Sequence, residues 1–463
     1  MNQLTLKVDL YEYSQVEKAC KLAAEKLGLS RDGLEADLQR LTGLLEYYRD
    51  QQLHKNKEHR PAKVQVPAAT ATKCIEFLKS DKLITKLNGL IGKAGIIGEE
   101  TNRILLFIIA SSYKMPDTLH ALIQGSSGSG KTQLLKVISE LMPPEDVKRY
   151  TRVTDNSFYN QDEYFFVHQL VCFEDLDGLK EDAQLAVREL QSNEILRTST
   201  SIKDKHGQIT GGERVVRGPI ASLACTTKGE VYEDNVSRSF LIAVDESREQ
   251  TLRVIRYQND TAAGLISKDE QRKVRAFVQN CIRLLKPYPV VNPYANKIKL
   301  PEEAHKIRRL NELYQCFVRQ ITLLNQYQRK QDGQGRLISE KADLQAACDI
   351  LFESIILKVD ELDGSLRQFF EKLKAFVQKK GKPACRNGSA GRDYEFNRFE
   401  LREALGLSKS QQHYYVNRLV ELEYLKQYGH ANRGYRYRIA HWDNIAAVRA
   451  RIKDNLQNQL DKL

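Results

Sequence analysis

The chain has 463 residues, of which 41% are hydrophobic and 29% charged, so it is long enough for two or three domains that each bury a core. Its most apolar stretch, 104–111, is too short to span a bilayer, and its charged first residues do not resemble a signal peptide. We therefore expect a cytoplasmic protein with no membrane partner. The net charge of +12 favours a polyanionic partner, although a solvated basic surface would have the same composition.

Hydrophobic spacing predicts four regions along the chain. Residues 1–72 have helical apolar spacing and end in a charged, proline-containing linker at 54–72. Residues 73–250 alternate strand-like and helical runs, the pattern of an α/β nucleotide-binding domain. Helical patterns dominate 251–380, and a Gly-rich segment then introduces a smaller region, 381–463. Eight cysteines fall in no C-x-x-C spacing, which argues against a zinc site.

A Gly-rich loop follows the apolar run His120–Gln124 and precedes a helical pattern. It reads G-x-x-x-x-G-K-T and comprises Gly125, Ser126, Ser127, Gly128, Ser129, Gly130, Lys131 and Thr132. In this motif the glycines let backbone N–H groups point at phosphates, and the start of the helix adds its positive dipole. Lys131 would reach the β- and γ-phosphates, and the Thr132 hydroxyl would coordinate Mg²⁺. The sequence therefore predicts a site for ATP and Mg²⁺.

A second apolar strand, Leu170–Phe173, ends in Glu174 and Asp175. We expect this strand beside the P-loop strand in a parallel sheet, as a Walker B strand. By register Glu174 supports Mg²⁺ and Asp175 polarises the attacking water. The usual order is Asp and then Glu, so the two roles are open to exchange, and Asp177 is a third carboxylate within reach.

Two further candidates follow along the chain. The strand Ile220–Cys225 ends in Thr226 and Thr227, and we expect Thr227 or its neighbour to hold the lytic water, the sensor-1 role. Arg238 precedes the strand Leu241–Val244 and is a candidate arginine finger for the ATP of a neighbouring subunit, because guanidinium meets phosphate oxygens with two donors. A surface ion pair is the alternative for Arg238.

Alternating β-branched and polar residues over 197–210 surround a Lys-His-Gly tip, which predicts a β-hairpin. Lys203 and Lys205 would contact DNA phosphates, a contact independent of base sequence. A plain surface hairpin without DNA contact is the alternative.

The last region predicts a winged helix, because a helix (396–405), a turn (406–408), a helix (409–422) and a hairpin (424–439) follow in that order. Ser408 is the expected N-cap of the second helix. Residues 382–463 carry 15 basic and 9 acidic residues, half of the net charge. Winged helices also bind proteins, so DNA is one of two partners open here. The expected DNA-contacting residues are Lys409, Gln411, Gln412, His413 and Asn417 on the helix, and Arg433, Arg436 and Arg438 on the wing.

Several of these segments together resemble one family. Phe173–Asp177 is a hydrophobe followed by acid, acid, hydrophobe, acid, and it resembles the Walker B segment of the minichromosome-maintenance helicases, which are AAA+ ATPases. Segment 188–204 is similar to their helix and pre-sensor-1 hairpin, and segment 237–240 to their arginine-finger turn. Ile307–Leu310 resembles their sensor-2 helix, which places Arg308, or in its stead Arg309, on ATP.

The chain as a whole is similar to the ATPase regions of replication proteins of bacterial mobile genetic elements, often joined to a CHC2-type primase. The resemblance implies an α/β AAA+ P-loop ATPase core with a helical N-terminal region, a helical lid and a C-terminal winged helix. It implies a homo-oligomer, in the form of a hexameric ring, that uses ATP and Mg²⁺ to move along single-stranded or forked DNA as a translocase or helicase. A primase is a further expected partner.

Three departures from the helicase family keep other functions open. The segment between Thr154 and Leu170 has no room for the family's extra helical insert, no zinc-bearing N-terminal pattern is present, and the acidic pair is swapped. One alternative is a replication initiator or helicase loader that hydrolyses ATP without unwinding DNA. Another is an AAA+ transcription activator or protein remodeller.

Overall fold

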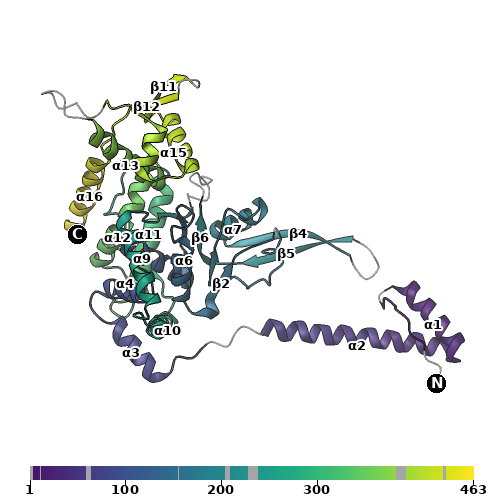
Figure 1. The fold of residues 1–463 in the computed structure, drawn as a ribbon. Coiled ribbons are helices and arrows are strands. Elements are labelled where there is room, and N and C mark those ends of the chain that lie inside the picture. The colour runs from purple at the N-terminus through teal and green to yellow at the C-terminus, as the bar shows by residue number, and fades with distance from the viewer. Residues whose placement is uncertain are drawn as a thin grey trace. The chain divides into compact units, whose positions relative to one another are not determined.

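The computed structural model describes residues 4–10, 12–58, 64–154, 156–203, 209–227, 238–381, 393–430 and 434–463. The chain divides into two compact units (Figure 1). The first unit comprises Met1–Gln65 and Ser199–Glu213, and the second comprises Val66–Thr198 and Arg214–Leu463.

The first unit contains two helices that pack together, α1 (Tyr13–Leu27) and α2 (Arg31–Glu58). α1 ends at Gly28, whose φ of 67° lies in the left-handed region that favours glycine. Its residues Val16 and Cys20 are buried. The apolar spacing predicts both helices, and α2 extends to Glu58, into the segment predicted as a linker.

A parallel sheet of strand order β2-β3-β6-β1-β7 forms the centre of the second unit. Its strands are β1 (His120–Gln124), β2 (Val147–Tyr150), β3 (Gln169–Phe173), β6 (Ile220–Thr226) and β7 (Phe240–Ala243). Because β6 separates β3 from β1, the expectation that the strand before Glu174 lies directly beside the P-loop strand is wrong. All residues of β6 are buried, and a strand buried throughout needs a paired neighbour along each edge, which only an interior place supplies.

Alternate residues of these strands face two different hydrophobic cores. Ala121 and Ile123 face a large core, whereas Leu122 between them faces a smaller one. The helices that contribute to these cores beside the sheet are α5 (Glu100–Ser111) and α6 (Lys131–Glu140) in the large core and α7 (Glu181–Asn193) in the smaller one. Figure 1 shows α6 and α7 on opposite sides of β6. The sheet is therefore a layer between helices, which gives the buried strands an apolar contact on each face.

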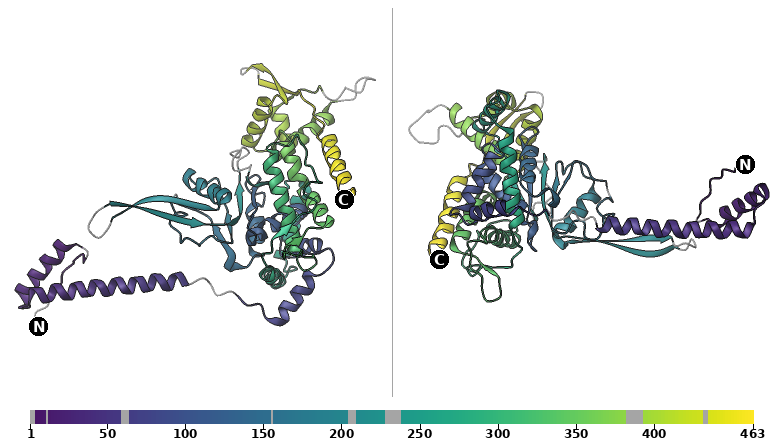
Figure 2. Two further views of the ribbon diagram at one scale, coloured as in Figure 1. Left: turned by 180° about the vertical axis from the view of Figure 1, so that it is seen from behind. Right: turned by 90° about the horizontal axis from the view of Figure 1, so that it is seen from below.

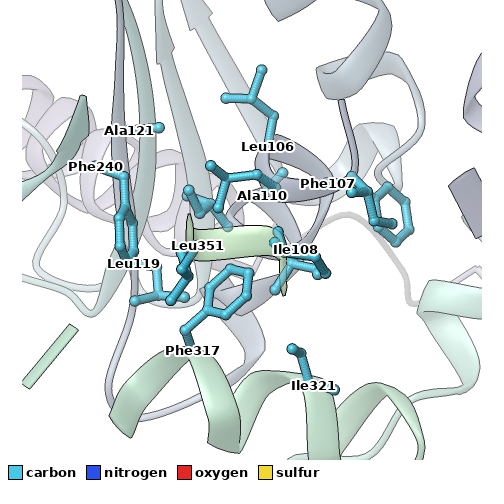
Figure 3. Packing of buried hydrophobic residues seen from close by; sticks show 14 of the residues in the cluster. Leu106, Phe107, Ile108, Ala110, Leu119, Ala121, Phe240, Phe317, Ile321 and Leu351 are labelled. Carbon is cyan, nitrogen blue, oxygen red and sulfur yellow. The ribbon is translucent and has the colours of Figure 1, made fainter. Parts of the chain in front are cut away.

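Other helices of this unit surround the sheet or extend the large core. They are α3 (Ala68–Leu78), α4 (Leu83–Lys93), α9 (Arg248–Ala262), α10 (Lys268–Leu284), α11 (Ile307–Leu324), α12 (Lys341–Val359) and α16 (Ile445–Asp461). Phe317 of α11 packs edge-on against Phe240 of β7, with ring centroids 5.8 Å apart (Figure 3). α3 packs on α10, so the compact unit already includes residue 68, before the start at 73 that the sequence predicts.

Residues 364–381, 393–430 and 434–439 form a C-terminal module around a third core. Its elements are α13 (Gly364–Lys380), β10 (Phe396–Asn397), α14 (Arg398–Leu405), α15 (Lys409–Glu421), β11 (Leu425–His430) and β12 (Gly434–Ile439). The three strands have the order β10-β12-β11. The segment predicted as one helix, 396–405, begins instead with β10, because Phe396 pairs with Tyr437 of β12.

The module does not coincide with the predicted region 381–463. Phe370 of α13 shares the third core with Phe396, so this core extends across the boundary predicted at residue 381. α16 leaves the module, because its residues Ile452 and Leu456 join the large core. The apolar side of α16 packs against α12, and this contact is between segments far apart in sequence.

A two-stranded hairpin, β4 (Ile195–Lys203) and β5 (Ile209–Arg217), agrees with the hairpin predicted over 197–210. Its two strands run side by side in both views of Figure 2. At its base, Arg217 forms an ion pair of 2.6 Å with Glu163. The short elements are η1 (Ser112–Lys114), η2 (Pro144–Asp146) and the paired strands β8 (Val290–Val291) and β9 (Leu337–Ile338).

Candidate nucleotide-binding site

The Gly-rich loop joins the buried strand β1 to the start of α6, as the motif predicts. Gly128 and Gly130 have φ angles of 82° and 97°, which side chains with a Cβ rarely adopt. Nothing lies within 4 Å of a Cβ built at either position, so glycine is required here by the backbone angle and not by space. Gly130 gives α6 no side-chain cap, and the N–H groups of its first turn are directed at the loop.

Lys131 is buried, with 7% of its surface exposed, and its ammonium group turns back onto the loop. Nζ donates hydrogen bonds to the carbonyl oxygens of Gly125, at 2.8 Å, and Ser126, at 2.6 Å. The Ser126 N–H donates to Oε1 of Glu246 at 2.6 Å. The loop carbonyls therefore bind the ammonium group of Lys131, and the Ser126 N–H binds the carboxylate of Glu246.

The residues of this loop fit a nucleotide with Mg²⁺. Ser129 Oγ is buried without a hydrogen-bond partner in the described part of the chain, and a phosphate oxygen would accept its proton. The uncapped start of α6 supplies N–H groups for the same anion. Thr132 is exposed at this start, and a hydroxyl together with a nearby carboxylate is the oxygen ligand set that Mg²⁺ prefers.

The acidic pair and the P-loop lysine gather around the end of β6. Burial raises the pKa of the Cys225 thiol to about 12, Lys131 lowers that pKa, and Glu174 and Asp175 raise it. All three charges therefore lie close enough to Cys225 to affect it, on the edge of the sheet where parallel strands end. The sequence predicted this grouping, although β6 intervenes between the two motifs.

Glu174 carries a contact that the sequence did not predict. Its Oε1 accepts a hydrogen bond from Nη2 of Arg149, the third residue of β2, at 2.7 Å. β2 pairs with β3, which brings Arg149 beside the end of β3. A charge-assisted bond of this kind is an interaction that a metal ion on Glu174 would have to compete with.

Asp177 links the acidic segment to both sensor-1 candidates. Its Oδ1 accepts from the Thr226 hydroxyl at 2.7 Å, and its Oδ2 accepts from the Thr227 N–H at 2.7 Å and from the Thr227 hydroxyl at 3.0 Å. The Leu176 N–H also donates to the carbonyl of Cys225 at 2.9 Å. The segment after β3 is thus tied to the end of β6, and both threonines share one carboxylate.

Arg238 lies at the other edge of the sheet. It precedes β7 by two residues, and Phe240 of β7 pairs in register with Ala121 of β1. The P-loop follows the opposite end of β1, and β1 and β7 are parallel. About four strand residues, or roughly 13 Å, therefore separate the level of Phe240 from that of the loop in the same chain, and Arg238 precedes Phe240 by two residues on the side away from the loop.

The predicted sensor-2 arginines lie in the first turn of α11, where Arg308 is exposed and Arg309 half-buried. Arg309 lies near Lys358 of α12. Burial, together with the positive charges of Lys306 and Arg309, lowers the pKa of Lys358 to about 8. The His305 N–H donates to the Lys358 carbonyl at 2.7 Å, which ties the start of α11 to the end of α12.

The residues predicted to contact DNA differ in what the structure shows of them. Lys205 and Arg433 lie outside the described residues, and Lys203 is the last residue of β4. Lys409 and Arg436 are exposed, and Arg436 lies 3.8 Å from Glu395. Arg438 donates to the Tyr428 hydroxyl at 2.9 Å and lies over its ring. Lys409 is the first residue of α15, and Arg436 and Arg438 belong to β12.

The expectation that Gln412 faces a DNA groove is wrong. Gln412 is buried, and its side-chain amide donates to the backbone carbonyl of Arg398, because this position on α15 faces α14. Arg398 also donates to His413, at 2.7 Å, and to Asn417, at 2.6 Å. The expected N-cap is present: Ser408 accepts from the Gln411 N–H at 3.2 Å, and Gln411 returns the contact in a capping box.

Sequence reasoning missed Arg149 and Glu246. Neither belongs to a motif, and each reaches the site from a neighbouring strand of the sheet. A signal for Glu246 existed, because it follows a strand, as Glu174 does, and the carboxyl ends of parallel strands meet at one edge. Arg149 lies within β2, and only the pairing of β2 with β3 identifies it.

Residues 67–286 match a family model described as MTBMA_p00010 P-loop domain. The matched range begins just before α3, ends just after α10 and contains the whole parallel sheet with its Gly-rich loop. The match supports a P-loop domain in this part of the chain, and nucleotide hydrolysis is the activity that such a domain indicates. No curated protein matches the chain. None of the helices in the described ranges is long and apolar enough to cross a membrane.

Proposed function

We propose that the chain is an AAA+ ATPase that works as a ring on DNA, as a translocase or helicase in the replication of a mobile genetic element. The observation that carries the ATPase part is the grouping of the Gly-rich loop, Glu174, Asp175 and the two threonines at one edge of the sheet. Lys131 would leave the loop carbonyls for the β- and γ-phosphates, and Thr132 and Glu174 would hold Mg²⁺. The bound Mg²⁺ would neutralise charge on the phosphates.

Asp175 would orient the attacking water, and Thr227 would hold that water from its other side. Asp177 would keep both threonines in place through its three hydrogen bonds. The reaction needs no covalent intermediate on the protein, because water attacks the γ-phosphate directly.

The position of Arg238 supports assembly of several copies. Arg238 lies at the amino edge of the sheet, and the P-loop of the same chain follows the carboxyl edge. Such an arginine would meet the phosphates of a neighbouring copy, with each nucleotide shared between two subunits. A closed ring gives every copy such a neighbour, and we propose a hexamer. Arg308 would approach the nucleotide from the first turn of α11.

The C-terminal module supports DNA as the partner. α13, β10, α14, α15, β11 and β12 succeed one another as helix, strand, two helices and hairpin, and we interpret this order as a winged helix. Lys409 lies at the start of α15, and Arg436 and Arg438 lie on the hairpin that would be the wing. The aromatic side chains Tyr428 and Tyr435 are exposed between them, which suits contact with unpaired bases.

Hydrolysis rates with and without single-stranded DNA test this proposal. We expect DNA to stimulate the wild-type rate, Lys131→Ala to abolish hydrolysis, and Lys136→Ala, which removes an exposed lysine of the same helix, to retain it. A wild-type rate that DNA leaves unchanged would contradict the motor and favour a protein remodeller or transcription activator. A rate that Lys131→Ala leaves unchanged would contradict the ATPase site itself.

Strand displacement on forked DNA separates a helicase from an initiator or loader. The contact that favours the second candidate is the Arg149–Glu174 ion pair, which engages one of the two acidic residues. We expect unwinding at saturating ATP. DNA-stimulated hydrolysis without any unwinding would refute the helicase and retain the loader.

The DNA surface has its own test. We expect Arg436→Ala and Arg438→Ala to weaken binding of a fluorescent oligonucleotide and to lower the salt dependence of binding, since each phosphate contact releases counterions. Arg451→Ala is the matched control, because Arg451 is an exposed arginine of α16 outside the module. Equal affinity in all three variants would place the DNA elsewhere on the chain.

A further inference from the structure

The side chain of Glu246 contacts the beginning of the Gly-rich loop. Its Oε1 accepts the Ser126 N–H at 2.6 Å, and a Cβ added to Gly125 would lie 3.1 Å from the same oxygen. The P-loop otherwise presents N–H groups to phosphate oxygens. A carboxylate is thus held on the loop that a polyanion must approach, while Lys131 is held on the loop carbonyls.

The backbone around Glu246 is fixed on both sides. The Val244 N–H donates to the Gln124 carbonyl at 3.0 Å, which continues the pairing of β7 with β1. The Asp245 N–H donates to Oε1 of Glu99 at 2.8 Å. Ser247 then caps α9 by accepting the Gln250 N–H at 3.1 Å. Because residues 244, 245 and 247 are all held by hydrogen bonds, the fold fixes the backbone from which the Glu246 side chain extends.

The C-terminal module reaches the same place. α13 begins at Gly364, and a Cβ there would lie 2.7 Å from that of Ala243, the last residue of β7. The absence of a side chain therefore lets the start of this helix touch the strand that leads to Glu246. The contact lies within the second compact unit of the chain.

α15 places Tyr415 beside this contact. The Tyr415 ring stacks on Phe369 of α13, with ring centroids 4.9 Å apart. Burial raises the pKa of Tyr415 to about 12, and the charges of Glu246 and Asp363 add to the rise. The same helix carries Lys409 and His413 on its exposed side. α15 thus has a candidate DNA surface on its outer side, and on its inner side Tyr415 packs on α13, the helix that touches the strand leading to Glu246.

We propose that Glu246 is a positioning residue that holds the P-loop in a state of low nucleotide affinity, and that the C-terminal module controls this state through Tyr415. The inference rests on the proposed function, since it presumes a nucleotide at the P-loop and DNA on the module. A nucleotide enters when Glu246 leaves the Ser126 N–H and Lys131 leaves the loop carbonyls. DNA that shifts α15 moves Tyr415 away from Glu246 and eases this exchange.

The charge of Glu246 sets the size of the effect. At an effective dielectric constant of about 20, a negative charge roughly 10 Å from a phosphate weakens binding on the order of tenfold. Glu246→Gln removes this charge and keeps an oxygen that accepts the Ser126 N–H. The loop geometry is then retained, and the repulsion alone is lost. The gain in affinity is confined to ligands with phosphates and shrinks as salt screens the charge.

Binding of the fluorescent nucleotide MANT-ADP to the full chain tests the inference. Glu246→Gln binds MANT-ADP about tenfold more tightly than the wild type, with MANT-adenosine unchanged. Glu249→Gln is the charge-matched control, because Glu249 is an exposed residue of α9 three positions along, and its affinity stays at the wild-type value. Equal or weaker MANT-ADP binding by Glu246→Gln overturns the proposal and leaves Glu246 as an anchor of the loop.

Tyr415→Phe tests the link to the module, with Tyr414→Phe, the adjacent tyrosine on the same helix, as its control. Tyr415→Phe tightens MANT-ADP binding, Tyr414→Phe does not, and the double variant Glu246→Gln/Tyr415→Phe binds no more tightly than Glu246→Gln alone. Additive gains, or no gain from Tyr415→Phe, overturn the role of Tyr415. Lys131→Ala distinguishes a failure of this inference from a failure of the proposed function. If Lys131→Ala loses MANT-ADP binding while Glu246→Gln binds as the wild type does, only this inference is refuted. If Lys131→Ala binds MANT-ADP as tightly as the wild type, the nucleotide site itself is refuted.

Discussion

Replacement of Asp177 tests how the hydrolytic edge of the sheet is held together. In Asp177→Ala, the Thr226 hydroxyl and the Thr227 N–H and hydroxyl all lose their shared acceptor. A hydrogen bond to a charged group contributes about 1.5–3 kcal/mol, and we discount this to about 1 kcal/mol for each bond because Thr227 is exposed. The total is about 3 kcal/mol. If the transition state needs both threonines in place, the turnover number falls by about 100-fold.

Asp177→Asn sharpens this prediction. The amide oxygen of the asparagine can still accept the Thr227 N–H, and its NH₂ can donate to the Thr226 hydroxyl, which accepts as readily as it donates. We therefore expect a loss of about tenfold or less, so that Asn is clearly more active than Ala.

Steady-state ATP hydrolysis measures both variants, and thermal unfolding checks that they remain folded. Asp182→Ala, which removes an exposed acid of α7, is the control and should hydrolyse ATP as the wild type does. A folded Asp177→Ala with a turnover number within about twofold of the wild type would refute the reasoning, because the three bonds would then contribute nothing to the reaction.

Three further predictions concern other contacts. Arg149→Ala frees Glu174 from an ion pair worth about 1 kcal/mol, so the Mg²⁺ concentration for half-maximal hydrolysis should fall by about fivefold; a rise would contradict a metal-binding Glu174. Asp343→Ala removes the fully buried carboxylate that accepts two hydrogen bonds from Arg329 and leaves that arginine only the longer ion pair with the more exposed Glu340, so it should cost about 3–5 kcal/mol in urea unfolding. Asp269→Ala, which removes one partner of an exposed ion pair, should cost nothing measurable. The folded-state pKa of Lys358, about 8, lies below its unfolded value, so the unfolded chain binds the extra proton between them and stability rises as pH increases from about 8 to about 10.5. Lys358→Met should be more stable at neutral pH and lack this rise, and an unchanged pH profile of unfolding would contradict it.

The nucleotide site could be predicted because its chemistry is local. A phosphate needs consecutive N–H groups, and Gly128, Gly130 and the start of α6 supply them within one short segment. The strand before Glu174 was identifiable for a similar reason, since an apolar run that ends in acids is contained in adjacent residues. Hairpins and caps, such as β4–β5 and Ser408, also depend on neighbours in sequence.

The boundaries of the four predicted regions were harder to predict from the sequence. The boundary predicted at residue 381 followed a change in composition, whereas the cores follow packing between distant segments. α13 precedes the boundary predicted at residue 381 and yet packs in the third core with the elements that follow it. α16 is the last helix of the chain and yet packs against α12. Spacing of apolar residues indicates that a helix has a buried side but not which partner covers it.

By itself, the sequence determined the Gly-rich loop, the acidic residues at the end of β3 and the two threonines at the end of β6, because each is written in consecutive residues. Only the tertiary structure decided the strand order, in which β6 separates β1 from β3. It also decided contacts between distant segments: Arg149 pairs with Glu174, Glu246 accepts a hydrogen bond from the loop, and Tyr415 stacks on Phe369. The physical reason is that these contacts join residues far apart in the chain, and their partners are chosen by packing and not by any local pattern.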